Sequence, residues 1–365
     1  MNPLSNPIGA IAEGLDGLLR SLMPEWLASL LMALIGAGLI AAIVSGVVIL
    51  LVWMERKIIA RMQDRSGPNR VGPFGLLQTV ADAIKLLAKE DIVPARVDKV
   101  IWALSPIVVL AAALMAWAVI PWSPGVVPSN INVGVLYVLS MGSLPVIGVV
   151  MAGWGSNNKY ALLGGMRSAA QLVSYEIPGV LSALVPVMLA GTMSMTGIVE
   201  AQEAPTRLGG IPNWWFIFTP WGFIAFIIFV ISGLAETNRT PFDLIEAESE
   251  LAAGFHTEYS GMRFALFFLA EYANIFAVSA IGATLFMGGW AGPIPFVSSF
   301  GPGILFFLGK TFFLVFVFMW IRSTLPRLRY DQLMNFAWKR LLPAGLVIVG
   351  VTATWITASN AFLRV

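Results

Sequence analysis

Acidic side chains gather in one segment of this 365-residue sequence, between Ala235 and Arg263. Six carboxylates fall within 23 residues there: Glu236, Asp243, Glu246, Glu248, Glu250 and Glu258. Neighbouring carboxylates raise one another's pKa, so some of them are expected to hold protons near neutral pH. Proton transfer is therefore the first chemistry that this segment suggests.

The segment has two interpretations. A run of acids is usually a solvated surface loop. Here the acids alternate with large apolar residues, which favours a loop packed against other protein: Phe242, Leu244, Ile245, Leu251, Phe255 and Tyr259. Asp243, Glu246 and Glu250 are spaced i, i+3 and i+7, which would place them on one helical face. We predict a packed acidic segment.

Two further acids, Glu176 and Glu271, lie inside long apolar stretches. A carboxylate at the centre of a membrane helix costs about 2.5–3.5 kcal/mol on insertion scales, so each must be paired, protonated or hydrated. A hydrogen-bonded contact between helices would explain either residue alone. Together with the acidic segment, they suggest a hydrated track leading into the membrane.

The chain has few residues that bind redox groups. It has no cysteine and a single histidine, His256. This excludes cysteine-ligated iron–sulfur clusters, bis-histidine haem and multi-histidine zinc or copper sites on the chain itself. We expect no redox cofactor and no metal here.

Composition identifies the environment of these residues. The chain is 58% hydrophobic and only 12% charged, with a mean hydropathy of +0.82 and a net charge of +2. A soluble domain carries about 25% charged residues and could not cover its surface with half of that. The chain is therefore predicted to be a polytopic membrane protein.

Apolar runs predict an all-α fold with eight transmembrane helices in a single membrane domain, 1–365. The N-terminus does not resemble a signal peptide, because Glu13 and Asp16 precede its first basic residue, Arg20. The expected spans are 26–54, 100–120, 133–153, 165–190, 214–234, 264–288, 303–323 and 341–358.

Basic residues set the predicted orientation. Eighteen of the 22 lie in loops on one side of these spans, nine of them in 55–99 alone. Lysine and arginine concentrate in cytoplasmic loops, so both termini are expected outside and the long loops 55–99 and 235–263 in the cytoplasm.

Loop 55–99 contains one more predicted element. After Pro73, apolar residues fall on one helical face (Leu76, Leu77, Val80, Ile84 and Leu87) and polar residues on the other (Gln78, Asp82, Lys85 and Lys89). This pattern predicts a short amphipathic helix in the membrane interface. It is either a simple surface anchor or one wall of an entry from the lipid.

Both long loops closely resemble a known family. The sequences MERKIIARMQDRSGPNRVGPFGLLQTVADAIKLL and AETNRTPFDLIEAESELAAGFHTEYSGMRFALFFLAEYANIF are similar to the signatures of the H subunit of NADH-quinone oxidoreductase, the subunit-1 family of respiratory complex I. The stretch QLVSYEIPGVLS around Glu176 resembles the family's fourth span. These matches cover about 80 residues and carry long, specific motifs.

The resemblance implies a subunit of a proton-translocating NADH:quinone oxidoreductase. It implies quinone as substrate, and peripheral partner subunits that complete the quinone site and carry flavin and iron–sulfur clusters. It also implies membrane-arm partner subunits. The implied quinone entry and chamber involve Arg56, Arg65, Phe74, Asp82, Glu236 and Asp243. The implied proton path consists of Glu246, Glu248, Glu250, Glu258, Glu176 and Glu271.

Three alternatives remain open. The chain could anchor a related membrane-bound hydrogenase, act as a stand-alone secondary transporter, or serve only as a structural anchor. Transporters usually show inverted repeats and paired broken helices, and no such repeat is detectable here. Nothing suggests nucleic-acid binding. We favour a bacterial plasma (inner) membrane over a mitochondrial inner membrane.

Overall fold

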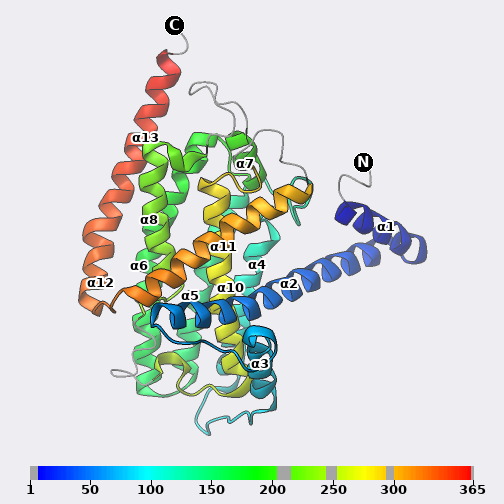
Figure 1. The fold of residues 1–365 in the computed structure, drawn as a ribbon, viewed down its shortest axis with the longest axis vertical. Coiled ribbons are helices and arrows are strands. Elements are labelled where there is room, and N and C mark those ends of the chain that lie inside the picture. Colours follow the sequence, from blue (N-terminus) through cyan, green and yellow to red (C-terminus); the bar gives the residue numbers. More distant parts are fainter. Residues whose placement is uncertain (1–6, 204–214, 244–252, 293–299, 363–365) are drawn as a thin grey trace.

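The computed structural model describes residues 7–203, 215–243, 253–292 and 300–362. Helices dominate these residues (Figure 1). Seven are long and apolar enough to cross a membrane. The remaining predicted span is α8 (Pro220–Glu236), a 17-residue apolar helix about 26 Å long. The prediction of an all-α polytopic membrane protein is confirmed.

The seven longer spans follow the predicted order. They are α2 (Glu25–Met62), α4 (Lys99–Met115, extended by a 3-10 turn at Ala116–Ala118), α5 (Gly134–Gly155), α6 (Lys159–Ala190), α10 (Gly261–Phe286), α11 (Phe300–Thr324) and α13 (Leu342–Phe362). The last continues from α12 (Tyr330–Phe336) through a π-helical turn, Ala337–Leu341. The termini of several spans carry side-chain caps: Asp98, Asn158 and Thr219 accept hydrogen bonds from the first turns of α4, α6 and α8.

Among the described residues, three shorter helices lie outside the spans. The amphipathic helix predicted after Pro73 is α3 (Gln78–Ala88), preceded by a 3-10 turn at Pro73–Gly75. The other two, α1 (Pro7–Leu22) and α7 (Met195–Glu203), were not predicted from the sequence.

Helix α10 lies at the centre of the bundle, and nearly every residue from Tyr272 to Phe286 is buried. Its Phe276 stacks on Trp117 of the 3-10 turn after α4, with ring centroids 4.4 Å apart. From Tyr272 onwards α10 is surrounded by protein, so polar groups there are shielded from lipid. Glu271, directly before this stretch, faces protein at Arg239.

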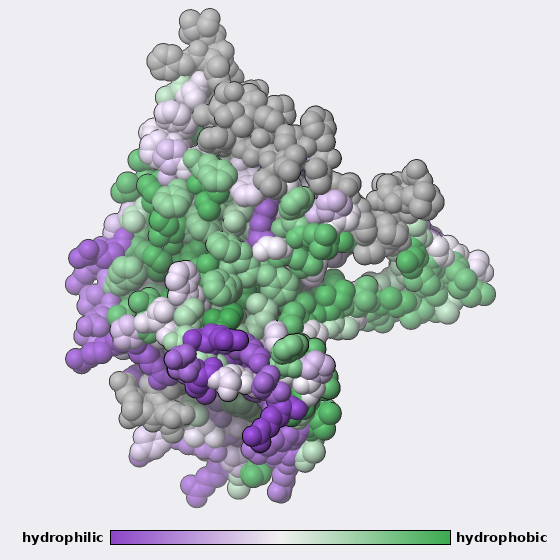
Figure 2. Space-filling view, in the orientation of Figure 1, coloured by the Kyte–Doolittle hydropathy of each residue, from purple (hydrophilic) through white to green (hydrophobic). Residues whose placement is uncertain are grey.

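Helix α2 is the exception to this compact packing. Its 38 residues span about 57 Å, nearly twice the hydrocarbon thickness of a bilayer, which requires a strong tilt. Figure 1 shows it crossing the bundle and continuing beyond it, with α1 at its far end. In Figure 2 the projecting part is hydrophobic along its length, and hydrophilic residues gather at the lower part of the molecule.

Candidate functional site: a buried ion network beside two acid-lined cavities

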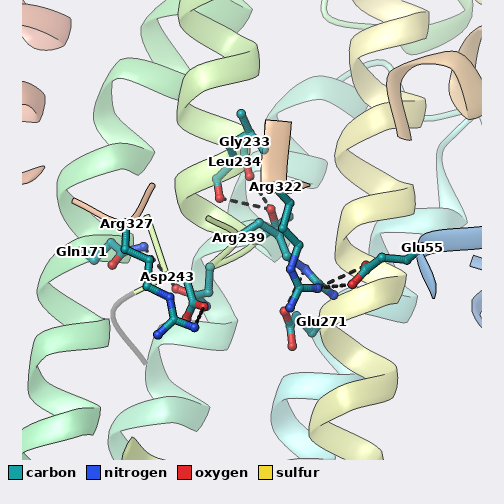
Figure 3. Close-up of polar contacts among 11 residues, drawn as sticks. Glu55, Gln171, Gly233, Leu234, Arg239, Asp243, Glu271, Arg322 and Arg327 are labelled. Carbon is teal, nitrogen blue, oxygen red and sulfur yellow. Dashed lines mark hydrogen bonds and ion pairs between the residues drawn. The ribbon is translucent and has the colours of Figure 1, made fainter. Parts of the chain in front are cut away.

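A buried arginine organises the charged residues between the spans. Arg239, directly after α8, lies 3.3 Å from Glu55 on α2 and 3.0 Å from Glu271 on α10 (Figure 3). Arg322 near the end of α11 binds the same Glu55 carboxylate. Two arginines and two glutamates from four parts of the chain thus form one network without net formal charge.

Arg239 is buried and keeps its positive charge there. The side chain of Arg239 is only 4% exposed and lies over the ring of Tyr272, 4.3 Å from its centroid. Burial alone would lower the pKa of Arg239, but Glu271 and Glu55 raise it well above its usual value. Arg239 therefore stays cationic and holds both glutamates.

A second set of contacts fixes the start of the acidic segment. Asp243 is 3% exposed and pairs with Arg327 at 2.9 Å. Beside it, Nε2 of the buried Gln171 on α6 donates to the carbonyl oxygens of Ala235 (2.9 Å) and Phe242 (2.8 Å). One side-chain amide therefore holds both ends of the short stretch between α8 and Asp243 in place.

Two small cavities continue from these groups into the bundle. The first, about 60 Å³, is lined by Glu236, Asp243, His256 and Glu271 among others. The second, about 50 Å³, is lined by Glu176 and shares Glu236 and Asn274 with the first. Each has room for a few water molecules beside several polar groups. Glu271, Glu236 and Glu176 thus line adjoining hydratable spaces.

His256 contributes a neutral wall to the first cavity. It lies in a 3-10 turn (Gly254–His256) among the rings of Phe255, Phe264 and Phe267. Burial lowers the pKa of His256 to about 3, so its imidazole is uncharged at neutral pH.

A larger cavity of about 500 Å³ lies between α2, α3 and α10. Its walls are largely apolar, with Val48, Val52, Leu86 and Phe268 among the lining residues. Arg56 and Asp82, which also line it, form an ion pair of 2.6 Å. The cavity is shaped by three elements and combines an apolar wall with a few charged groups, the Arg56–Asp82 pair together with Lys85 and Lys89, as sites for amphiphilic ligands do.

The structure does not bring every predicted residue to these cavities. Arg65 is exposed and donates to Gln63, and Phe74 is 76% exposed at a positive φ of 54°. Neither lines the three cavities above. Glu258 accepts a hydrogen bond from Asn158 at 2.7 Å and lines a separate surface hollow. Glu246, Glu248 and Glu250 lie outside the described residues.

Three members of the network, Glu55, Arg239 and Arg322, were not predicted as site residues from the sequence. Glu55 is the acid that ends the long apolar run of α2, and its place before Arg56 was the available signal. Its partners are 184 and 267 residues away along the chain, so only the fold reveals the pairing.

Lys310 on α11 binds backbone oxygens of a neighbouring segment. Its ammonium donates to three backbone carbonyls just after α10, those of Met287 (2.6 Å), Gly289 (2.9 Å) and Ala291 (2.6 Å). It also lies over the ring of Trp215, 4.1 Å from the centroid. The lysine therefore satisfies a non-helical turn beside the membrane-spanning helices.

The part of the chain that the structure describes contains no evident metal-binding site. There, no group of three or more histidine, aspartate or glutamate side chains is arranged to hold a metal ion. The chain contains no cysteine at all.

These features define a class: a multi-pass membrane protein with charged groups inside its helical bundle and an apolar cavity at its side. Residues 35–353 match the family model of NADH dehydrogenase. The chain belongs to the family of the H subunits of NADH-quinone oxidoreductase and is a subunit of that oxidoreductase complex.

Relatives support this over most of the chain. It is 51% identical to the H subunit of the NADH-quinone oxidoreductase of Dehalococcoides mccartyi (strain CBDB1), covering 84% of this chain and 82% of that protein. The corresponding subunits of Paraburkholderia xenovorans and Brevibacillus brevis are each 48% identical. These alignments cover 89% and 92% of this chain and 91% and 96% of the relatives.

Proposed function

We propose that this chain forms part of the quinone entry and chamber of the complex and couples quinone reduction to proton translocation. The entry is the cavity between α2, α3 and α10. Its apolar wall suits an isoprenoid tail, and the Arg56–Asp82 pair suits a polar headgroup passing it. Partner subunits supply flavin and iron–sulfur clusters and complete the headgroup site. Arg65 and Phe74, both exposed, remain as positions at which the ligand or a partner would make contact.

The observation that carries the coupling is the shared guanidinium of Arg239. It joins Glu55, on the helix that lines the entry, to Glu271, which lines the first small cavity. Reduction of quinone in the chamber changes local charge and creates a demand for protons. Added negative charge near Glu55 would draw Arg322 or Arg239 towards it and weaken the hold on Glu271.

A released Glu271 would take up a proton, because a carboxylate without a cationic partner is costly inside a membrane. The proton would then pass through the water-sized spaces to Glu236 and on to Glu176. Glu246, Glu248, Glu250 and Glu258 would feed this path from the acidic segment, and Asp243 would hold the segment in place through Arg327. We place both termini outside and loops 55–99 and 235–263 in the cytoplasm of a bacterial plasma membrane.

Glu176→Gln tests this proposal, because glutamine keeps the size of the side chain but carries no titratable proton. In the assembled complex we expect the number of protons pumped per quinone reduced to fall by more than half. NADH oxidation with an artificial acceptor, which requires only the peripheral arm, should stay unchanged. Glu200→Gln on α7, an exposed glutamate away from both cavities, is the matched control. Wild-type pumping by Glu176→Gln would reduce this residue to a structural contact.

A further inference from the structure

Helix α1 carries an apolar stripe that no described part of the chain covers. Ile11, Leu15, Leu18 and Leu22 are spaced i, i+4, i+7 and i+11, which places them on one face of a helix. Their exposed fractions are 64%, 44%, 56% and 70%. Four large aliphatic side chains in a row would be costly in water.

The opposite face of α1 carries its charges. Glu13, Asp16 and Arg20 follow the i, i+3, i+7 spacing, and at 3.6 residues per turn they lie roughly half a turn from the apolar stripe. A helix with an apolar stripe on one side and charges directly opposite is suited to lie in the plane of a membrane surface.

The connection to α2 places α1 at such a surface. Only Met23 and Pro24 separate the two helices. Arg20 pairs with Asp16 within α1 (2.7 Å) and with Glu25 across the bend (3.1 Å). Trp26, 71% exposed, then opens the apolar run of α2. Tryptophan at the end of a span commonly marks the boundary between lipid and water.

From these observations we infer that α1 is a membrane-interface anchor, with its apolar stripe in the acyl chains and its charged stripe in water. It would lie on the membrane face opposite α3. The occupant of the stripe is lipid, because the neighbouring half of α2 exposes the same kind of surface at Trp26, Leu30 and Leu34. The family match also begins at residue 35, so α1 precedes the part of the chain that the family model covers.

Such an anchor would fix the tilt of α2. The C-terminal half of α2 is buried in the bundle at Val44, Val48 and Leu51. The N-terminal half, next to α1, has little protein contact. With one end held by the bundle and the other by the interface, α2 has a defined angle. This angle would set the width of the lipid-facing cavity that α2 lines, a consequence that rests on the proposed function.

The absence of native cysteine makes a direct test possible. Two single-cysteine variants, Leu18→Cys and Glu13→Cys, report on the two stripes. They are labelled with a membrane-impermeant maleimide in the assembled complex in native membranes, and as the full chain alone in phosphatidylethanolamine–phosphatidylglycerol liposomes. We expect Leu18→Cys to react about tenfold more slowly than Glu13→Cys in both, because a thiol among acyl chains is shielded from the aqueous reagent and forms less of the reactive thiolate. Denaturation in detergent should equalise the rates.

The other outcomes would overturn the inference. Equal, rapid labelling of both positions would place α1 in water. Equal protection would bury the whole helix. Protection of Leu18→Cys in the complex but not in liposomes would assign the stripe to a partner protein. These readouts do not depend on catalysis, so they stay valid whatever happens to the proposed quinone chamber.

Discussion

Glu55 on α2 and Glu271 on α10 bind the same buried guanidinium, that of Arg239, at 3.3 and 3.0 Å. At such separations two unit charges interact by about 5 kcal/mol at an effective dielectric constant near 20. A change of charge beside one glutamate is therefore felt at the other. The pairing links the helix that lines the large cavity to a residue that lines the first small one.

Loss of Glu55 should destabilise the protein strongly. Glu55→Gln leaves two arginines, Arg239 and Arg322, without their shared carboxylate, and breaking a buried pair costs about 3–5 kcal/mol. We expect a lower melting temperature of the purified complex and less of this chain in the membrane. Asp331→Asn, which removes the partner of the exposed Arg329, is the control and should change neither. A Glu55→Gln complex with the melting temperature of the wild type would show that the network does not stabilise the protein.

The part of the site that could be predicted consists of acids in apolar surroundings. Glu176, Glu236 and Glu271 stand out because a carboxylate beside or within an apolar run demands an explanation. The partners of Glu271 could not be predicted, because Arg239 meets Glu271 and Glu55 only where the segment after α8 packs against α10 and α2. The eight apolar runs and the helix after Pro73 followed from composition and periodicity alone, which local sequence determines.

Helix α1 was missed for a different reason. Its apolar and charged stripes are visible in the sequence at Ile11, Leu15 and Leu18 and at Glu13 and Asp16. The N-terminal segment fails the pattern of a signal peptide, and that comparison alone does not reveal a helix. Amphipathic periodicity applied to residues 7–22 would have found it.

Gly142 on α5 lies where the two small cavities adjoin. It lines both, and a Cβ added there would lie 3.1 Å from Oε1 of Glu236. Gly142→Ala should therefore push Glu236 aside and narrow the water-accessible connection. We expect proton pumping per quinone reduced to fall severalfold, measured in proteoliposomes, with the complex still assembled. Gly350→Ala on α13, where an added Cβ meets nothing within 4 Å, is the matched control. Unchanged pumping in Gly142→Ala would show that protons do not need this passage.

Lys310 should matter for stability rather than for coupling. Lys310→Met keeps the apolar stem but leaves the carbonyls of Met287, Gly289 and Ala291 without their donor. Each unsatisfied buried acceptor costs about 1–3 kcal/mol, so a loss of about 3 kcal/mol or more is expected. Thermal unfolding of the complex measures this, with the exposed Lys339→Met as control. Lys310→Met with normal stability but no pumping would instead assign the lysine to the proton path.

The buried imidazole of His256 should make the stability of the fold sensitive to acid. Its pKa is lowered by burial from 6.5 to about 3, so between these values the unfolded chain binds a proton that the folded chain does not. Stability therefore falls as the pH drops below 6.5, by up to about 1.4 kcal/mol per pH unit from this group. His256→Asn removes the titration, so its melting temperature should decline less steeply from pH 6.5 towards pH 4 than that of the wild type. Since His256 is the only histidine, no other imidazole of this chain obscures the comparison. Parallel declines in the two proteins would mean that the imidazole is protonated in the folded state and that the first cavity is wetter than its aromatic walls imply.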